Sequence, residues 1–159
     1  MMSLRSHWER LWDQELGAVT MEFAVSCVLH LALLFGVMEA SLGVYAFHFT
    51  AEAAREGTRY ASVRGFSCTG SISACPAQSS DIQAYVKGIA YPGIDPAAMT
   101  VTTTWSAFPS GTVCSPSTSC NNPGDLVTVV VQYQFPFSVP LLPANTWAVT
   151  STSAMVISQ

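Results

Sequence analysis

The sequence predicts an α+β protein in which one long N-terminal helix precedes a small head with a short helix and a three-stranded antiparallel sheet. Two observations lead to this prediction. The apolar run from Gly17 to Phe49 is far too long for a strand, whereas the C-terminal half holds short segments in which apolar and polar residues alternate. We therefore expect three parts: a polar segment at 1–17, a transmembrane and stalk helix at 18–64, and the head at 65–159.

The composition of the chain limits its function classes. At 159 residues the chain suits one membrane anchor and one small domain, and its apolar fraction of 50% is too high for a disordered chain. Because the formal net charge is −4, the chain has no excess of positive charge to hold a phosphate backbone. Nucleic-acid binding is therefore not expected.

The centre of the apolar run is suited to a lipid bilayer. From Phe23 to Met38 the only ionisable group is His30, and at about 1.5 Å per residue this stretch reaches roughly 24 Å. A hydrocarbon core of about 30 Å takes a few more residues from either side. A cleaved secretory signal is the rival interpretation, but the length of the run and the poor cleavage sequence at 38–40 argue against it.

A carboxylate, Glu22, lies just inside the start of the apolar run. An ionised carboxylate in hydrocarbon is costly unless a positive group neutralises it, so Glu22 requires a partner. The alternative is a plain transmembrane anchor whose Glu22 lies among the lipid headgroups. Small residues recur further along the run, at Ala32, Gly36 and Ala40, on one helical face that a second helix could approach closely. Small residues are also common in membrane helices generally, so both interpretations of this face stand.

The helical pattern continues past the apolar run as TAEAAREGTRYASVRG. One apolar stripe is predicted at Leu42, Tyr45, Phe49 and Ala53. The charged residues Glu52, Arg55, Glu56 and Arg59 are spaced for ion pairs between positions i and i+3, although a simple solvated face would explain them equally well. We expect the helix to run from about Ala18 to about Val63 and to end at Gly65, with Gly57 weakening it slightly.

Four cysteines follow the helix in polar loops: Cys68, Cys75, Cys114 and Cys120. An even set in the loops of a small exported domain predicts two disulfides. We favour the pairs Cys68–Cys75 and Cys114–Cys120, each of which closes a short loop, with crossed pairing as the rival. A metal site is the other alternative, but no spacing is CxxC and no histidine is near in sequence.

The head should contain one helix and three strands. Residues 81–90 have helical spacing of apolar residues after an N-cap at Ser79 or Ser80. Strands are predicted at 99–105, 126–135 and 146–157 from their alternation, and the strongest of them has Val127, Val129, Val131, Tyr133 and Phe135 on one face. We expect the apolar face of the sheet to be covered by the short helix and by the outer half of the long helix.

A first resemblance lies at the start of the apolar run. Gly17, followed by four residues and then Glu22-Phe23, resembles the processing site of type IV prepilins, where a membrane-embedded prepilin peptidase cuts after the glycine. The resemblance implies a leader at 1–17, a new amino terminus at Ala18, and pairing of Glu22 with the free α-amino group of a neighbouring subunit. The leader departs from the usual pattern, because its two arginines are accompanied by three acids: Glu9, Asp13 and Glu15.

A second resemblance makes the family more specific. AAREGTRYASVRG, at 53–65, resembles the segment that follows the membrane helix in TadE-like proteins, the minor pilins or pseudopilins of tight-adherence (Tad, type IVc, Flp-type) pili. The order of GxxxxEF, an apolar helix with Glu39 near its end, and AAREGxRYA is more specific than any one part. The resemblance implies a pilin-like fold and singles out five signature positions: Arg55, Glu56, Gly57, Arg59 and Tyr60.

The implied role is structural rather than catalytic. Outside the long helix the head offers only Asp81, Lys87, Asp95 and Asp125, so no nucleophile, base and orienting acid can be assembled, and no cofactor is expected. The resemblance implies a single-pass protein of the bacterial cytoplasmic membrane, with its head outside the cytoplasm or in an extracellular pilus used for adhesion. The implied partners are the prepilin peptidase, other pilin or pseudopilin subunits, the pilus assembly platform and membrane lipid.

Two other roles stay open. The alternatives to a minor pilin or pseudopilin are an uncleaved bitopic membrane protein whose extracytoplasmic head is a binding module, and a major filament subunit.

Overall fold

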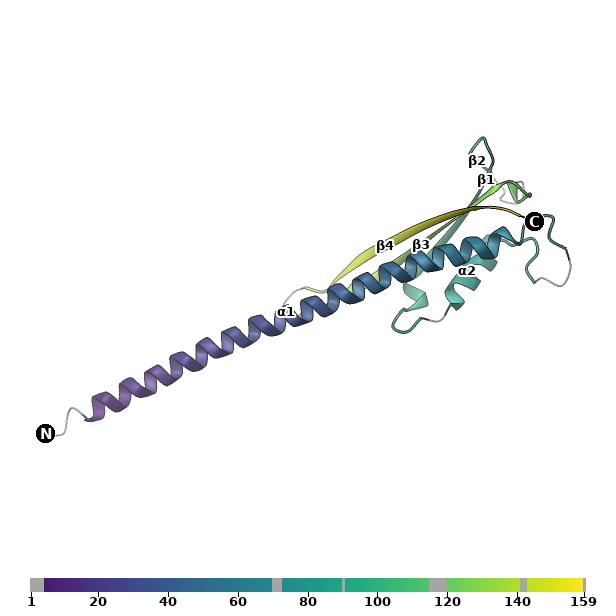
Figure 1. Cartoon of the computed structure of the whole chain (residues 1–159). Helices are drawn as coiled ribbons and strands as arrows, with labels where there is room; N and C mark the ends of the chain where they lie inside the picture. The colour runs from purple at the N-terminus through teal and green to yellow at the C-terminus, as the bar shows by residue number, and fades with distance from the viewer. Residues whose placement is uncertain (1–4, 70–72, 90, 115–119, 141–142, 159) are drawn as a thin grey trace. The chain divides into compact units, whose positions relative to one another are not determined.

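The computed structural model describes residues 5–69, 73–89, 91–114, 120–140 and 143–158, with side chains from residue 17 onward. Its elements are α1 (Arg5–Ser62), α2 (Ser79–Gly88), a 3-10 helix (Pro96–Ala98), β1 (Met99–Ala107), β2 (Thr112–Val113), β3 (Leu126–Phe137) and β4 (Asn145–Val156), as drawn in Figure 1. The predicted α+β architecture with one long N-terminal helix is confirmed.

The contacts of the chain divide it into two compact units. Unit 1 comprises Met1–Ser41 with Ser138–Ala144, and unit 2 comprises Leu42–Phe137 with Asn145–Gln159. The division falls within α1, so the last third of this helix belongs to the same unit as α2 and the sheet. The helix begins before Gly17 and ends at Ser62, close to the expected end.

The first part of α1 has the character of a membrane span. Between Gly17 and Ser62 the helix contains an 18-residue window with a mean hydropathy of 2.0, none of which is buried within the chain. Large apolar side chains such as Val19, Phe23, Leu29 and Leu33 are all more than half exposed. This part of α1 is therefore long and apolar enough to cross a bilayer, and its apolar side chains are not covered by the rest of the chain.

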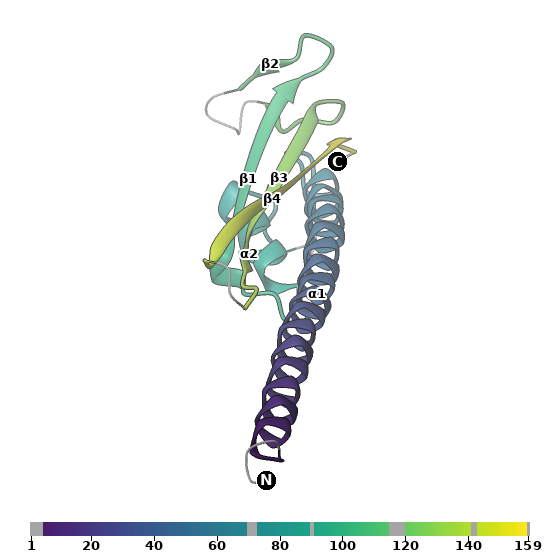
Figure 2. The same ribbon diagram turned by 90° about the vertical axis from the view of Figure 1, so that its left-hand side faces the viewer.

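The sheet has four strands in the order β2-β1-β3-β4, and all neighbours are antiparallel. Figure 2 shows β1, β3 and β4 side by side, with β2 at the far end of β1. The prediction of three strands was therefore one short, because β2 pairs through only two residues, Thr112 and Val113, too few to leave an alternation pattern. β3 also continues through Pro136 to Phe137, two residues past its expected end.

The core of unit 2 lies between the sheet, α2 and the last part of α1. The predicted inner face of β3 is confirmed, since Val127, Val129 and Val131 are fully buried and Tyr133 and Phe135 nearly so. From α2, Ile82 and Val86 are fully buried. These residues form one hydrophobic cluster with α1 residues such as Phe49 and Ala53, which confirms that both helices cover the apolar face of the sheet.

Two local predictions need correction. Of the predicted stripe on α1, Phe49 and Ala53 are buried, whereas Leu42 is 51% and Tyr45 38% exposed. The buried stripe of α1 is instead made largely of small residues: Ala46, Phe49, Thr50, Ala53, Ala54, Gly57, Thr58, Ala61 and Ser62. The N-cap of α2 is Gln78 rather than Ser79 or Ser80, and the Asp81 carboxylate accepts a hydrogen bond of 2.9 Å from the Gln78 backbone N–H.

Candidate functional site

The predicted processing segment, residues 17–22, lies on an uninterrupted stretch of α1. Gly17, Ala18 and Glu22 are all exposed, and a Cβ added at Gly17 would meet nothing within 4 Å. The described side chains offer Glu22 no ion-pair partner, since the ion pairs they form are Arg55–Glu52 and Arg59–Glu56. Pairing of Glu22 with the amino terminus of a neighbouring subunit therefore stays a prediction.

The predicted packing face lies one to three turns further along the same helix. Ala32 and Gly36 are partly buried and Ala40 is exposed, and a Cβ added at Gly36 would have open space around it. These positions lie in unit 1. They remain a predicted contact surface for another helix.

The signature segment, residues 53–65, occupies the end of α1 within unit 2. Its first two arginines form the predicted i,i+3 ion pairs: Arg55 to Glu52 at 3.3 Å and Arg59 to Glu56 at 3.2 Å. Both arginine side chains are about two-thirds exposed, at 67% and 69%. Exposed pairs of this kind contribute little to stability. Because both side chains are exposed, the two guanidinium groups are accessible to a partner.

Gly57 lies where three elements meet. A Cβ added there would be 2.9 Å from Val86 Cγ2 of α2 and 3.1 Å from Val129 Cγ1 of β3. Gly57 is itself buried. The absence of a side chain therefore lets α1 approach α2 and the sheet at the same point, and the helical weakness expected of this glycine is offset by close packing.

Tyr60 is clamped between two side chains. Its ring stacks on that of Tyr85 from α2, with centroids 4.2 Å apart and an interplanar angle of 19°. The guanidinium carbon of Arg64 lies 3.7 Å from the centroid of the same ring. Since two planar groups this close cannot share one face, Tyr85 and Arg64 cover opposite faces of Tyr60. This arrangement fixes the end of α1 to α2.

Polar contacts hold the end of α1 to the rest of unit 2. Arg64 donates through Nε to the Ser73 carbonyl at 3.2 Å and through Nη1 to the Tyr60 carbonyl at 3.1 Å. On the sheet side, the Thr58 and Ser153 hydroxyls are 3.0 Å apart, and the Ser158 N–H donates to the Ser62 carbonyl at 2.8 Å. The signature segment is therefore the part of the helix that is joined to both α2 and β4.

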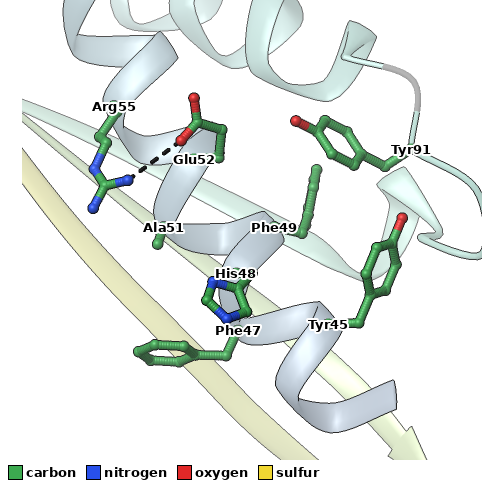
Figure 3. A pocket seen from close by; sticks show the side chains of 8 residues that line it. All are labelled: Tyr45, Phe47, His48, Phe49, Ala51, Glu52, Arg55 and Tyr91. Atoms are coloured by element: carbon green, nitrogen blue, oxygen red, sulfur yellow. Dashed lines mark hydrogen bonds and ion pairs between the residues drawn. The ribbon is translucent and has the colours of Figure 1, made fainter. Parts of the chain in front are cut away.

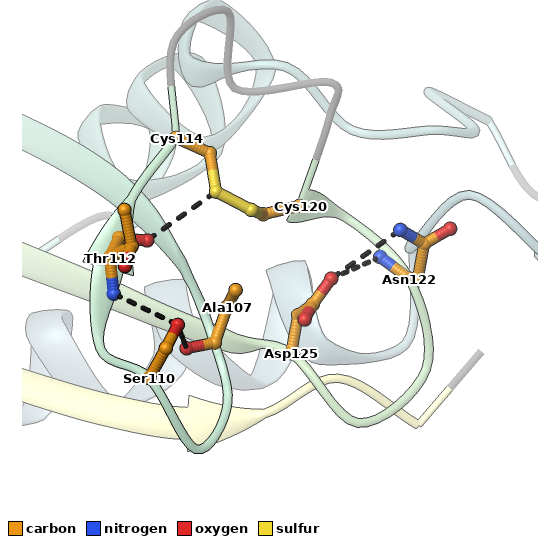
Figure 4. Close-up of a disulfide and its surroundings, with 7 residues drawn as sticks. All are labelled: Ala107, Ser110, Thr112, Cys114, Cys120, Asn122 and Asp125. Atoms are coloured by element: carbon orange, nitrogen blue, oxygen red, sulfur yellow. Dashed lines mark hydrogen bonds between the residues drawn. A yellow bond between two sulfur atoms is a disulfide. The ribbon is translucent and has the colours of Figure 1, made fainter.

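The two favoured disulfides are present. Cys68 pairs with Cys75 and Cys114 with Cys120, with Cα atoms 6.0 and 5.9 Å apart. Figure 4 shows the second bridge beside the turn that leads into β3, where the Asp125 carboxylate accepts hydrogen bonds from the Asn122 backbone and side chain. Cys27 is left as a free thiol in the apolar part of α1. The cysteines of the head thus close two short surface loops.

A shallow hollow of about 380 Å³ borders α1 near the start of unit 2. It is lined by aromatic side chains, among them Tyr45, Phe49 and Tyr91, and by the Glu52–Arg55 ion pair, as Figure 3 shows. Within the described ranges no cluster of three or more His, Cys, Asp or Glu side chains could hold a metal ion. Two of its side chains are held by hydrogen bonds, Tyr45 to the Pro92 carbonyl and Arg55 to Glu52.

The structure brings only some of the predicted residues together. The processing segment and the packing face lie in unit 1, whereas the signature positions lie in unit 2 and contact α2, β3 and β4. Sequence reasoning missed Arg64, Tyr85 and Asn121 as members of this region. Arg64 is part of the segment that carries the resemblance. The helical spacing of residues 81–90 places Tyr85 in a helix but does not indicate its contact with Tyr60. Asn121 donates to the Ala77 carbonyl at 3.5 Å, and no sequence pattern identifies it.

Comparison with known proteins agrees with the resemblance read from the sequence. The family model described as TadE-like protein matches residues 17–59. No curated protein and no solved structure matches the chain. The match begins at the glycine of the processing segment and ends within the signature segment. The TadE-like resemblance read from the sequence is therefore confirmed for residues 17–59, which match the TadE-like family model.

Proposed function

We propose that the chain is a minor pilin or pseudopilin of a Tad pilus system, anchored in the bacterial cytoplasmic membrane by α1 with its head outside the cytoplasm. The observation that carries this proposal is the TadE-like match from Gly17 to Arg59, which covers the apolar helix together with its acid and its signature. The apolar span of α1, which has no buried residue in its most apolar window, supports the anchor, and the two disulfides support a head in an oxidising compartment.

Processing by a prepilin peptidase after Gly17 is part of the proposal. A protease needs an extended backbone, and glycine in a helix is about 1 kcal/mol less favourable than alanine, which eases local unwinding at this bond. A Cβ built on Gly17 meets nothing within 4 Å, so unwinding there breaks backbone hydrogen bonds of the helix but no described side-chain packing at this position. Cleavage removes residues 1–17 and leaves Ala18 as an ammonium near the edge of the bilayer.

Assembly then follows from charge neutralisation. The Glu22 carboxylate and the new ammonium are each costly in hydrocarbon, and pairing between neighbouring subunits lowers the cost of both. The small residues Ala32, Gly36 and Ala40 let a second helix approach the same stretch of α1. Glu22 therefore recruits a partner subunit, while the exposed Arg55 and Arg59 are available for contacts outside the membrane.

The proposal excludes a catalytic role for the chain. The TadE-like family belongs to pilus systems and is not a family of enzymes. The partners it implies are the prepilin peptidase, other pilin or pseudopilin subunits and the assembly platform. Its contribution to adhesion is through the pilus and needs no active site.

A charge-neutral substitution tests the assembly role. In cells that contain the whole pilus system, Glu22→Gln should insert into the membrane as well as the wild type but fail to co-purify with a differently tagged pilin subunit. Glu22→Asp, which keeps the charge, is the matched control and should retain part of the association. Equal co-purification of the Gln variant and the wild type would show that Glu22 is only a headgroup contact and would remove the assembly role.

A further inference from the structure

Aromatic side chains from three distant segments gather at the end of unit 2 where α1 enters it. We define this aromatic collar as Tyr45, Phe47, Tyr91, Phe137 and Trp147. The Tyr45 hydroxyl donates to the Pro92 carbonyl at 3.1 Å, which places Tyr91 and Pro92 at the level of Tyr45. Phe137 and Trp147 stack with centroids 5.6 Å apart.

The register of the sheet places Trp147 at the same level of α1. Phe135 pairs with Trp147 across β3 and β4, and the ring of Phe135 is 3.9 Å from a Cβ built on Gly43. Further along, Ser153 contacts Thr58 and Ser158 contacts Ser62. β4 therefore runs in the same direction as α1, and Trp147 lies beside the first turn of α1 in unit 2.

Three of the five collar side chains are exposed, whereas Tyr91 and Phe137 are partly buried against the core of unit 2. Trp147 is 62% exposed, Phe47 is 54% exposed and Tyr45 is 38% exposed. Figure 3 shows Tyr45 and Phe47 leaving α1 on opposite sides, so both flanks of the helix carry an aromatic ring at this level. Exposure of large aromatic rings to water is energetically unfavourable, so a cluster of exposed rings indicates a surface that contacts lipid or another protein.

The surroundings along α1 indicate which medium that is. Before the collar, Leu42 and Val44 are more than half exposed and continue the bare apolar surface of the preceding residues. Between Glu22 and the collar the only acid is Glu39, whereas charged residues become frequent after the collar, with Glu52 and Arg55 in an ion pair. Aromatic residues placed between an apolar and a charged stretch are typical of the membrane–water interface, where the ring meets lipid and its polar atom meets water.

The lengths agree with this placement. From Glu22 to Phe47 the helix advances about 38 Å, which matches a hydrocarbon core of about 30 Å plus one headgroup region of roughly 5–7 Å, so Glu22 lies at the inner edge of the hydrocarbon when Phe47 lies in the outer headgroup layer. From these observations we infer that the aromatic collar lies in the lipid headgroup layer and holds the head of the protein directly on the membrane surface. The inference rests on the membrane anchor of the proposed function but not on processing or pilus assembly.

The four tryptophans of the chain allow a direct test. Trp8 and Trp12 lie in the leader, Trp147 is in the collar, and Trp105 is buried at the opposite end of the sheet, where it pairs with Val127, the partner of Met155. Eight residues of β4 separate the levels of Trp147 and Met155, which corresponds to about 26 Å. Trp105 is therefore a matched internal control outside the bilayer.

The experiment uses full-length protein in phosphatidylcholine vesicles with or without bromine on the acyl chains. One variant keeps only Trp147 (Trp8→Phe, Trp12→Phe, Trp105→Phe), and the control keeps only Trp105 (Trp8→Phe, Trp12→Phe, Trp147→Phe). Bromine near the headgroup end should reduce the Trp147 emission about twofold or more, bromine near the chain end should reduce it less, and the Trp105 emission should stay unchanged.

Flotation of the vesicles separates the possible failures. Protein that floats with Trp147 quenched no more than Trp105 would overturn the collar while leaving the anchor intact, and would point to a protein partner for these aromatic rings. Protein that does not float would overturn the anchor and the collar together. If Trp105→Phe disturbs the head, the Trp8→Phe, Trp12→Phe variant is compared with and without Trp147→Phe, and the quenched fraction of its emission should disappear with Trp147.

Discussion

Gly57 of α1 lies so close to Val86 of α2 that a Cβ at position 57 would be 2.9 Å from Val86 Cγ2, nearer than carbon atoms pack. Helix propensity alone favours alanine over glycine by about 1 kcal/mol. The contact reverses this preference, because the side chains of Val86 and Val129, or the elements that carry them, must move to admit a methyl group. Glycine at position 57 thus allows α1 to pack closely against both α2 and the sheet.

Gly57→Ala should destabilise unit 2 by about 1–3 kcal/mol in thermal or denaturant unfolding of the detergent-solubilised chain. Gly88→Ala is the matched control, since a Cβ at Gly88, the last residue of α2, meets nothing within 4 Å. That variant should be neutral or slightly stabilising. Gly57→Ala with unchanged stability would mean that α1 and α2 are not in contact at this point.

Tyr60 and Tyr85 should show a measurable coupling energy. Stacked rings contribute about 0.5–1.5 kcal/mol beyond their buried area, so a double-mutant cycle with Tyr60→Leu and Tyr85→Leu should return a value in that range. Coupling of Tyr60 to Tyr45, which contacts Pro92 instead, serves as the control and should be near zero. Equal coupling in both cycles would contradict the clamp.

The exposed signature arginines should matter for assembly and little for folding. Arg55→Ala and Arg59→Ala remove ion pairs whose arginine side chains are 67% and 69% exposed, so each should change the unfolding free energy by less than about 1 kcal/mol. Co-purification with other pilus subunits should fall if these guanidinium groups contact a partner. Arg64→Ala is the contrasting variant, because it removes the contact with Tyr60 and should lower stability. A large stability loss in the Arg55 or Arg59 variant would mean that these side chains serve the fold.

The disulfides should leave one free thiol. Mass spectrometry of peptides from the unreduced protein should find Cys68 joined to Cys75 and Cys114 to Cys120, and thiol labelling in denaturant should modify Cys27 alone. Removing either bridge by a double Cys→Ser change should cost about 2 kcal/mol, because each closes only a short loop. Crossed peptides would contradict the pairing.

Several features could be predicted from the sequence because they depend on local pattern. The alternation of Val127, Val129 and Val131 identifies β3 and its inner face, and the long apolar run identifies α1. The close spacing of the cysteines in two pairs indicated the pairing seen in the structure. In each case the residues that make the pattern are neighbours in the chain, so no long-range information is needed.

The remaining features depend on contacts between distant segments. β2 exists only because Thr112 and Val113 pair with the end of β1. The buried stripe of α1 consists largely of small and polar residues such as Thr58, so it leaves no hydrophobicity pattern in the sequence. A hydrophobicity pattern instead selects Leu42 and Tyr45, which lie at the very start of unit 2 and are exposed. The Tyr60 clamp and the aromatic collar join residues far apart in sequence, which no local pattern specifies.

The most direct test of the proposed function is the identity of the first residue of the protein in the membrane. Mass spectrometry of the N-terminal peptide, from cells with an active prepilin peptidase, should find a chain that begins at Ala18, and a peptidase-deficient strain should retain the leader. A chain that begins at Met1, or at any residue other than Ala18, in peptidase-active cells would contradict processing and remove the ammonium that Glu22 is proposed to neutralise.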